Sequence, residues 1–233
     1  MANNIRVISF DLDDTLWPGM PTILAAENKL YRFLQENVSV ITQRYDMMQL
    51  RDRRRELLSR YPELAHDLSA LRLRSFEALA DEFGLGREWI RPAFELFYEA
   101  RQQVSLFPDV APVLEALQQQ YRLASLTNGN ADPEKTGVAH WFEYSLNSIT
   151  AGSLKSQPMI YRQLQRQMGV SAGEHVHVGD DPENDVLGAK TAGAFAIWLN
   201  REQKPWPLGD CQPDSEIQNL HALPAVLATL GRD

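Results

Sequence analysis

The sequence predicts a doubly wound, Rossmann-like α/β fold, in which an inserted four-helix cap domain interrupts the chain of a parallel sheet. A short apolar run at 7–10 is typical of a buried strand, and clustered acids follow it directly. The segment 22–104 shows only the helical spacing of apolar residues. From 107 onward, strand patterns alternate with helix patterns, which indicates a parallel sheet covered by helices on both faces.

Composition narrows the classes of function. The chain has 233 residues, a net charge of −8 and a single cysteine. The acidic balance argues against nucleic-acid binding, and a lone cysteine excludes an intramolecular disulfide. The sequence shows neither a signal-peptide pattern nor an apolar run of the roughly 20 residues that span a membrane. We therefore expect a cytoplasmic protein with no nucleic-acid or membrane partner. The sequence does not decide whether its oligomeric state is a monomer or a homodimer.

The charge is divided unevenly along the chain. Residues 20–106 hold 13 basic and 13 acidic side chains, so the remaining residues carry the whole net charge of −8. Four helices are expected in this neutral part, at 22–37, 42–59, 63–83 and 88–104. The sequence thus predicts two bodies, which are a helical cap at 18–106 and an α/β core formed by 1–17 and 107–233.

The core elements are expected in a regular order after the cap. A helix at 108–120 precedes strands at 122–127 and 144–149, and a second helix covers 158–168. A strand at 175–178, a helix at 184–192 and a strand at 195–199 follow. Residues 200–214 are expected to form a loop, and a helix at 220–230 completes the fold.

Polar side chains follow several of these strands. The candidate groups are Asp11 and Asp13, Thr127 and Asn128, Lys155, and Asp180, Asp181 and Asp185. Because the carboxyl ends of parallel strands open at one edge of the sheet, these groups are expected to surround one point. A hydroxyl, an ammonium and several carboxylates around one point suit phosphoryl transfer assisted by a divalent metal.

These residues resemble the motifs of the haloacid dehalogenase superfamily. The matching stretches are Asp11-Leu12-Asp13-Asp14-Thr15, Ser125-Leu126-Thr127-Asn128, Lys155, and Gly179-Asp180-Asp181 with Asp185. They occur in the family's order, and the helical insert lies between the first two, as in subfamily I members with a C1 cap. One stretch departs from the family, because Lys155-Ser156-Gln157-Pro158 replaces a common Lys-Pro, which keeps Lys135 and Lys190 as weaker alternatives.

The resemblance implies a phosphoric monoester hydrolase that works through an aspartyl-phosphate. By this resemblance Asp11 is the nucleophile and Asp13 is the general acid and base. Thr127 binds a phosphoryl oxygen with help from the Asn128 backbone, and Lys155 offsets the charge of the nucleophile and the phosphoryl group. The dehalogenases of this superfamily lack an acid/base aspartate at the position of Asp13, so its presence favours phosphate esters over carbon–halogen bonds.

The resemblance also implies a metal site. Mg²⁺ would be held by Asp11, the backbone carbonyl of Asp13, and Asp180, and an all-oxygen ligand set favours Mg²⁺ over Zn²⁺. Asp181 and Asp185 would contact these ligands without binding the metal themselves, and Asp185 would orient the Lys155 side chain. Trp17 follows the catalytic loop closely and is a candidate for the substrate entrance, so it is expected at the mouth of the site.

The chain most resembles bacterial phosphatases of the flavin pathway and riboflavin biosynthesis. That resemblance implies a small phosphorylated metabolite, such as flavin mononucleotide or 5-amino-6-(5-phosphoribitylamino)uracil. Two alternatives stay open, which are a hydrolytic dehalogenase on the same fold and a non-enzymatic regulatory domain that accepts a phosphoryl group on an aspartate.

Two further features have plainer interpretations. The basic run at 51–56 is expected to be the solvated face of a cap helix, although it could meet an anionic substrate. His175 and His177 alternate on one strand and are expected to be core histidines without a metal.

Overall fold

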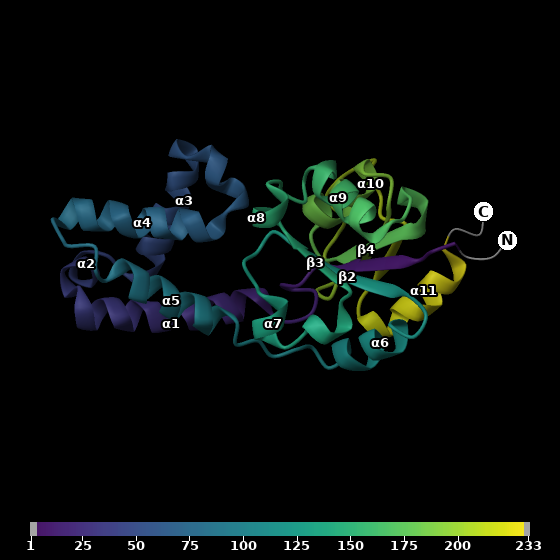
Figure 1. The fold of residues 1–233 in the computed structure, drawn as a ribbon, viewed down its shortest axis with the longest axis horizontal. Coiled ribbons are helices and arrows are strands. Elements are labelled where there is room, and N and C mark those ends of the chain that lie inside the picture. Colours follow the sequence, from purple (N-terminus) through teal and green to yellow (C-terminus); the bar gives the residue numbers. More distant parts are fainter. Residues whose placement is uncertain (1–3, 231–233) are drawn as a thin grey trace. The chain divides into compact units, whose positions relative to one another are not determined.

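The structure is a computed structural model and describes residues 4–230 (Figure 1). The chain divides into two compact units. One unit contains the residues up to Pro18 together with those from Ser105 onward, and the other is Gly19–Val104. Among the described residues, none of the helices combines the length and the apolar character that a membrane span needs.

The first unit is built on a six-stranded sheet in which every paired strand is parallel. The strand order is β3-β2-β1-β4-β5-β6. The strands are β1 Val7–Phe10, β2 Arg122–Thr127, β3 Tyr144–Asn147, β4 His175–Gly179, β5 Phe195–Leu199 and β6 Ser215–Ile217. The chain adds strands on one side of β1 and then on the other, so the order reverses at β1. Ligands bind at such a reversal, beyond the carboxyl ends of the strands.

Helices cover both faces of this sheet, as Figure 1 shows. Helices α9 (Pro158–Met168) and α10 (Gly188–Thr191) lie on one side, and α6 (Val110–Leu117) and α11 (Leu223–Thr229) lie on the other. The first face is closed by a continuous apolar layer of Val7, Leu126, Ile160, Tyr161, Leu164, Ala189 and Trp198, among others. The predicted doubly wound α/β fold is confirmed.

Several boundaries in the core differ from the sequence-based expectation. The strand expected at 144–149 ends at Asn147, because the Asn147 side chain accepts a hydrogen bond from Thr150 N at 2.9 Å and starts α8 (Ser148–Ala151). The helix expected at 184–192 begins earlier, with the π-helical turn η4 (Pro182–Leu187). Strand β6 was not predicted, since three residues at a sheet edge carry too short a pattern. The remaining short helices are α7 Pro133–Thr136, η2 Ala139–Trp141, η3 Ala172–Glu174 and η5 Leu220–Ala222.

The second unit is entirely helical. Its elements are α1 Gly19–Asn37, α2 Ser39–Arg44, α3 Met47–Arg60, η1 Pro62–His66, α4 Leu68–Phe83 and α5 Ile90–Arg101. The helix expected at 42–59 is in fact two helices. Asp46 and Gln49 form a reciprocal cap, with Gln49 N donating to Asp46 Oδ1 at 2.8 Å and Asp46 N donating to Gln49 Oε1 at 2.9 Å.

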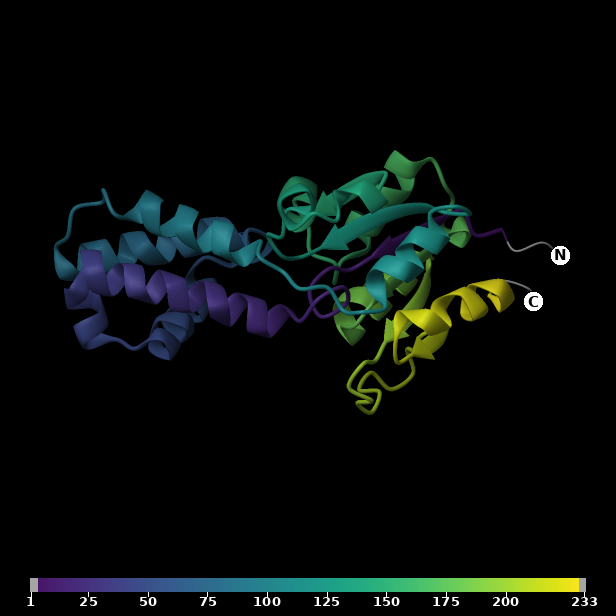
Figure 2. The ribbon, with the colours of Figure 1, turned by 90° about the horizontal axis from the view of Figure 1, so that it is seen from below.

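The helices of this unit bury an apolar core of their own. Ala26, Leu30 and Leu34 repeat every fourth residue on α1, so they form one stripe along that helix. This stripe packs with Phe76 and Leu79 of α4 in one cluster. Helix α1 runs alongside α5, which in turn packs against α4 (Figure 1 and Figure 2). The apolar residues whose helical spacing predicts a helix at 22–37 include this buried stripe.

Candidate active site

The loop after β1 presents its acids in different environments. The backbone N–H of Asp11 donates to Val178 O at 2.9 Å, which extends the pairing of β1 with β4 by one residue. The chain then turns tightly, with Asp14 N donating to Trp17 O at 2.7 Å and Asp14 itself at a φ of 60°. Asp11 is buried, Asp13 is half-buried and Asp14 is exposed. The turn thus directs Asp11 into the protein and Asp14 to solvent.

Lys155 lies at the centre of the site. Its side chain is buried, and its ammonium donates to Asp11 Oδ1 and, at 2.6 Å, to Asp185 Oδ1. The backbone N–H of Lys155 donates to the Asn128 side chain at 2.8 Å. A Cβ on Gly188 would come within 1.9 Å of the Lys155 carbonyl, so only glycine allows this close approach. Segments after β1, β2 and β4 therefore meet on one lysine.

The two other lysines considered from the sequence lie elsewhere. Lys190 is partly exposed and pairs with Asp214 at 2.7 Å. Lys135 belongs to the short helix α7 and is exposed to solvent. Among the described residues, Lys155 is thus the lysine that the ion pairs join to Asp11.

Asp185 is held from several sides. Its Oδ1 accepts from Lys155 and lies 3.0 Å from His177 Nε2, and its Oδ2 accepts from Asp181 N at 2.9 Å. A Cβ on Gly179 would lie 2.3 Å from the Asp185 carboxyl group, so glycine is required for the approach of this carboxylate to β4. Both oxygens of Asp185 are therefore already engaged by protein groups.

Thr127 and Asn128 end β2 beside these acids. The Thr127 hydroxyl oxygen accepts from Gly129 N at 2.9 Å, and its side chain is buried. The Asn128 amide donates to Asn184 Oδ1 at 3.0 Å, and Ser148 Oγ donates to Asn128 O at 3.1 Å. Asn128 thus connects three loops through its side chain and carbonyl, a role that the sequence analysis did not assign to it.

Asp180 and Asp181 follow β4 and have different surroundings. Asp180 Oδ1 accepts a long hydrogen bond of 3.4 Å from Thr15 Oγ1, and Trp198 Nε1 donates to the Asp180 carbonyl at 2.8 Å. Asp181 caps the turn η4, because its Oδ1 accepts from the backbone of Asn184 at 2.8 Å. The Asp180 carboxylate is thus the freer of the two, and Asp181 shapes the loop.

Three carboxylates fit a metal ion. One oxygen each of Asp11, Asp180 and Asp185 can lie within 4.8 Å of the others. Oxygen donors of this kind suit a hard divalent cation. Since Asp185 already bonds Lys155, His177 and a backbone N–H, Asp11 and Asp180 offer the more available oxygens.

Burial and like charges change the acidity of this group. Burial is the largest influence on Asp11 and, with Asp185 adding to it and Lys155 opposing it, raises the pKa from 3.8 to about 7. Burial and then Asp11 raise the pKa of Asp180 to about 9. Burial would also raise the pKa of Asp185, but Lys155 and His177 hold that pKa below its usual value. A cation beside Asp11 and Asp180 would stabilise their ionised forms.

These pKa values predict a pH-dependent stability in the absence of metal. In the folded state Asp11 and Asp180 keep protons that the unfolded chain releases near 3.8, so their contribution to stability is lost as the pH rises through about 7 and about 9. We expect the metal-free protein to melt at a lower temperature at pH ~9 than at pH ~5, and Mg²⁺ to raise the melting temperature more at the higher pH. Thermal unfolding with EDTA and with Mg²⁺ measures both. An equal effect of Mg²⁺ at the two pH values would contradict this prediction.

A buried hydrogen-bonded chain extends behind Asp185. Ser9 Oγ lies 2.7 Å from both His175 Nε2 and His177 Nδ1. Burial lowers the pKa of His175 to about 3, with His177 adding to the effect, and burial also lowers the pKa of His177. His177 therefore connects Ser9 to the Asp185 carboxylate. Core histidines are expected from the sequence, but this connection is not, because only the pairing of β1 with β4 brings Ser9 opposite His177.

Trp17 lies beside Asp13 in the same loop. Its indole N–H donates to Asp13 Oδ1 at 2.9 Å, and its side chain is completely buried. This contact orients the Asp13 carboxylate. A place for Trp17 at a substrate entrance stays a prediction, and the exposed area of Trp17 offers no support for it.

Comparison with known proteins identifies relatives over nearly the whole chain. The chain is 31% identical over 233 residues to the 5-amino-6-(5-phospho-D-ribitylamino)uracil phosphatase YigB of Escherichia coli strain K12, covering 96% of both proteins. A crystal structure of a 2-haloacid dehalogenase from Pseudomonas syringae pv. tomato DC3000 is 39% identical, with a TM-score of 0.88 over 96% of this chain and 98% of that one.

A third relative shares the fold. The HAD-hydrolase YfnB of Bacillus subtilis, whose crystal structure is bound to magnesium, has a TM-score of 0.67 at 22% identity, over 96% of this chain and 98% of that one. The model of the haloacid dehalogenase-like hydrolases matches residues 5–193, which contain all the candidate site residues named above. The chain therefore belongs to the haloacid dehalogenase-like hydrolase family, as a capped member of its phosphoric monoester hydrolases.

Proposed function

We propose that the core unit hydrolyses a small phosphorylated metabolite through an aspartyl-phosphate formed on Asp11, with Mg²⁺ as cofactor. The observation that carries this proposal is the position of the Lys155 ammonium, which bonds Asp11 and Asp185 together. An oxygen of Asp180 lies within 4.8 Å of oxygens of the same two acids. The ammonium and the carboxylates, contributed by separate loops, thus converge where charge must be neutralised during phosphoryl transfer.

The first step uses Asp11 and Asp13. The Asp11 carboxylate attacks phosphorus, the bond between phosphorus and the ester oxygen breaks, and Asp13 gives its proton to the departing oxygen. Trp17 holds the Asp13 carboxylate in one orientation for this transfer. Thr127 and the Asn128 backbone bind phosphoryl oxygens, and Lys155 offsets the growing negative charge.

The second step regenerates the enzyme. Asp13, now deprotonated, takes a proton from water, and the oxygen of that water attacks phosphorus. The bond between phosphorus and Asp11 breaks and inorganic phosphate leaves. Mg²⁺ bound to Asp11, the Asp13 carbonyl and Asp180 would neutralise phosphate charge in both steps. Asp185 and Asp181 keep Lys155 and the loop after β4 in place.

The flavin-pathway substrate is supported by one relative. The Escherichia coli protein that is 31% identical acts, by its name, on 5-amino-6-(5-phospho-D-ribitylamino)uracil. We propose this compound and flavin mononucleotide as the first substrates to test. The test is a screen of phosphorylated metabolites with Mg²⁺, in which release of inorganic phosphate is expected.

The same screen separates the alternatives. The similarity to a 2-haloacid dehalogenase structure justifies a second arm with 2-haloacids. Halide release without phosphate release would replace the proposed function by carbon–halogen hydrolysis. A long-lived phosphoryl group on Asp11 without turnover would instead indicate a regulatory domain.

Asp13→Asn should separate acid/base catalysis from metal binding. We expect kcat to fall by about 10²–10⁴-fold, because the amide can neither give nor take the proton. Mg²⁺ affinity should stay nearly unchanged, since the proposed metal contact of Asp13 is its backbone carbonyl. Phosphate release and calorimetric titration with Mg²⁺ measure the two effects. Loss of Mg²⁺ binding in this variant would count against the assignment.

A further inference from the structure

Two buried histidines lie behind Asp185 and have no part in the proposed steps of the reaction. His175 and His177 are both on β4 and are completely buried, as is Ser9 on the neighbouring strand β1. His177 Nε2 lies 3.0 Å from Asp185 Oδ1, the same oxygen that accepts from the Lys155 ammonium at 2.6 Å. The histidines are therefore linked to the carboxylate that holds the lysine of the site.

The Asp185 carboxylate determines which atom of His177 carries the proton. Burial would raise the pKa of Asp185, but Lys155 and His177 hold it below its usual value, so the carboxylate is ionised and has no proton to give. His177 Nε2 must then donate to Asp185. Burial lowers the pKa of His177, so its ring is neutral and its Nδ1 is an acceptor.

The remaining protons along the chain of hydrogen bonds follow from this one. Ser9 Oγ lies 2.7 Å from His177 Nδ1, so the Ser9 hydroxyl donates to that nitrogen. The Ser9 oxygen is then the acceptor for His175 Nε2, also at 2.7 Å. Burial lowers the pKa of His175 to about 3, so His175 Nδ1 is unprotonated and accepts from Gln165 Nε2 at 3.3 Å. The hydrogen bonds thus run in one direction, from Gln165 to Asp185.

Helix α9 packs against this chain of hydrogen bonds. Gln165 and Tyr161 are four residues apart on α9, so they lie on one face of it. The Tyr161 ring meets the His177 ring edge-on, with centroids 5.1 Å apart, and the Tyr161 hydroxyl donates to Asn184 O at 2.6 Å. Because Tyr161 is completely buried, the His177 ring cannot turn away from Asp185 without disturbing a close-packed layer.

The hydrogen bond from His177 has a consequence for Lys155. Asp185 Oδ1 accepts from an ammonium and an imidazole, while its Oδ2 accepts from Asp181 N at 2.9 Å. The carboxylate is thus fixed in position and kept as an acceptor. The Lys155 ammonium also donates to Asp11, so a shift of Asp185 would move the lysine relative to the nucleophile. Small misplacements of this kind are costly for a reaction rate.

We propose that His177 is a positioning residue which, held by Ser9 and His175, keeps Asp185 oriented so that Lys155 faces Asp11. This inference deepens the proposed phosphatase function and rests on it. It gives a task in the reaction to buried polar groups that lie behind the lysine of the site.

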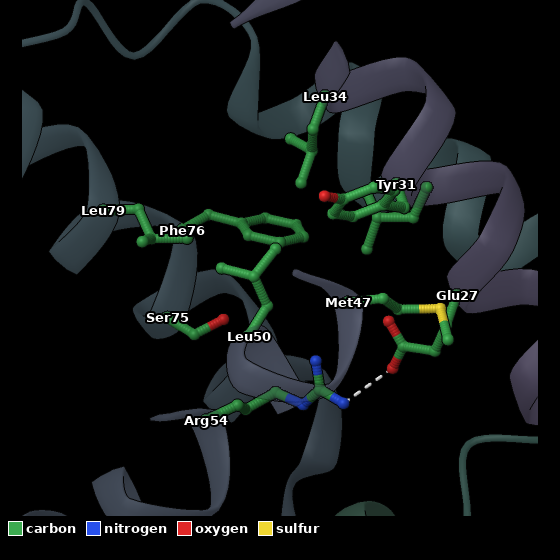
Figure 3. Close-up of a pocket in the computed structure, with 10 residues that line it drawn as sticks. Glu27, Tyr31, Leu34, Met47, Leu50, Arg54, Ser75, Phe76 and Leu79 are labelled. Atoms are coloured by element: carbon green, nitrogen blue, oxygen red, sulfur yellow. Dashed lines mark hydrogen bonds and ion pairs between the residues drawn. The ribbon is translucent and has the colours of Figure 1, made fainter. Parts of the chain in front are cut away.

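The cap unit also buries polar groups, and they provide a comparison. Figure 3 shows Arg54 reaching Glu27 at the edge of a pocket in this unit, with a hydrogen bond of 2.6 Å. Arg51 is 7% exposed, so the expectation that the basic run of α3 is a solvated face is wrong for this residue. Ser75 lines the same pocket, and its hydroxyl donates to Arg72 O at 2.6 Å. Ser75 is thus a buried serine whose hydrogen bond stays within α4.

Nitrogen NMR of the isotope-labelled full chain tests the proton positions without relying on turnover. The chemical shift of each histidine ring nitrogen reports whether that atom carries a proton. At pH ~7 we expect His175 and His177 to be neutral, with the proton on Nε2 in both rings. His177→Gln identifies the signals of His177 by their loss. A proton on Nδ1 of His177 would overturn the proposal.

His177→Phe should lower kcat for p-nitrophenyl phosphate by about tenfold or more and leave KM nearly unchanged, as is common for residues that hold the groups of a site in place. Phenylalanine fills the space of the imidazole but gives no proton to Asp185. His177→Gln places an amide N–H near the position of Nε2 and should restore part of kcat. This rescue would assign the effect to the hydrogen bond, because glutamine keeps the donor and loses the ring.

Two serine variants form a matched pair. Ser9→Ala removes the donor to His177 Nδ1, so it should lower kcat by about fivefold and shift the Nδ1 signal of His177. Ser75→Ala also removes a buried hydroxyl, but in the cap, and should leave kcat within about twofold, whatever its effect on the melting temperature. If His177→Phe does not fold, by circular dichroism, Ser9→Ala and the nitrogen signals carry the test.

The outcomes separate this inference from the function on which it rests. If His177→Phe melts at a lower temperature but keeps the kcat of the unmodified chain, the histidine is only structural and the proposal is wrong. Equal loss of kcat in His177→Phe and His177→Gln would also overturn it, because the hydrogen bond would not be the cause. Absence of turnover by the unmodified chain would refute the phosphatase function itself, whereas the nitrogen signals would still test the proton positions.

Discussion

Asp11→Asn should abolish phosphate release, with kcat lower by at least about a thousandfold. Asparagine has nearly the same shape as aspartate, but its amide is not a nucleophile and no aspartyl-phosphate can form. The fold should survive, because the substitution removes a buried carboxyl whose pKa is raised to about 7. Lys155 would keep its ion pair with Asp185. Turnover with saturating Mg²⁺ and thermal unfolding measure the two parts of this prediction.

A matched control comes from the same loop. Asp14 is exposed and has a φ of 60°, a conformation that asparagine also tolerates. Asp14→Asn should therefore leave kcat within about twofold, as expected of a surface substitution with little effect. Undiminished turnover in Asp11→Asn would refute the covalent mechanism, whatever the control shows.

Lys155→Met should reduce both stability and activity. Removing the ammonium leaves Asp11 and Asp185 buried beside each other without a counter-charge, which costs about 3 kcal/mol or more in the free energy of unfolding. The loss should be larger above pH 7 than below it, because Asp11 of the unmodified chain has a pKa of about 7 and Lys155 stabilises its ionised form only above that pH. kcat should fall by about 10²–10³-fold, as for the loss of a preorganised positive group.

Lys190→Met is the control for this substitution. Lys190 pairs with Asp214 in a partly exposed position, where an ion pair contributes at most about 1 kcal/mol. Urea unfolding at two pH values and steady-state kinetics compare the two variants. If Lys190→Met were the more damaging of the two, the assignment of Lys155 to the site would be wrong.

The sequence was sufficient for the fold class and for much of the candidate site. Strand β2 and helix α9 have the predicted bounds, because a short apolar run and a helix between Pro158 and Gly169 are marked locally. Asp11, Lys155 and Asp185 were selected as strand-end or helix-start residues. Parallel strands place such ends at one edge, and the structure brings these three together.

Other features depend on partners far away in the chain. Helices α2 and α3 were expected to be one, because their apolar pattern continues through the break and the Asp46–Gln49 cap is easily overlooked. The contact of Ser9 with His177 depends on the register between β1 and β4, which no local pattern encodes. No local pattern encodes the burial of Arg51 either, because a run of basic residues usually forms a solvent-exposed helix face.

The sequence by itself determined which groups are available, since the acids, the lysine and the threonine follow strand and helix signals that act over a few residues. Only the tertiary structure decided which partners each group contacts. Asp185 holds Lys155 because Gly179 and Gly188 allow close approach, and Asp181 caps a turn instead of facing the site. The physical reason is that burial and ion pairing depend on distances between segments, and these distances exist only once the sheet has formed.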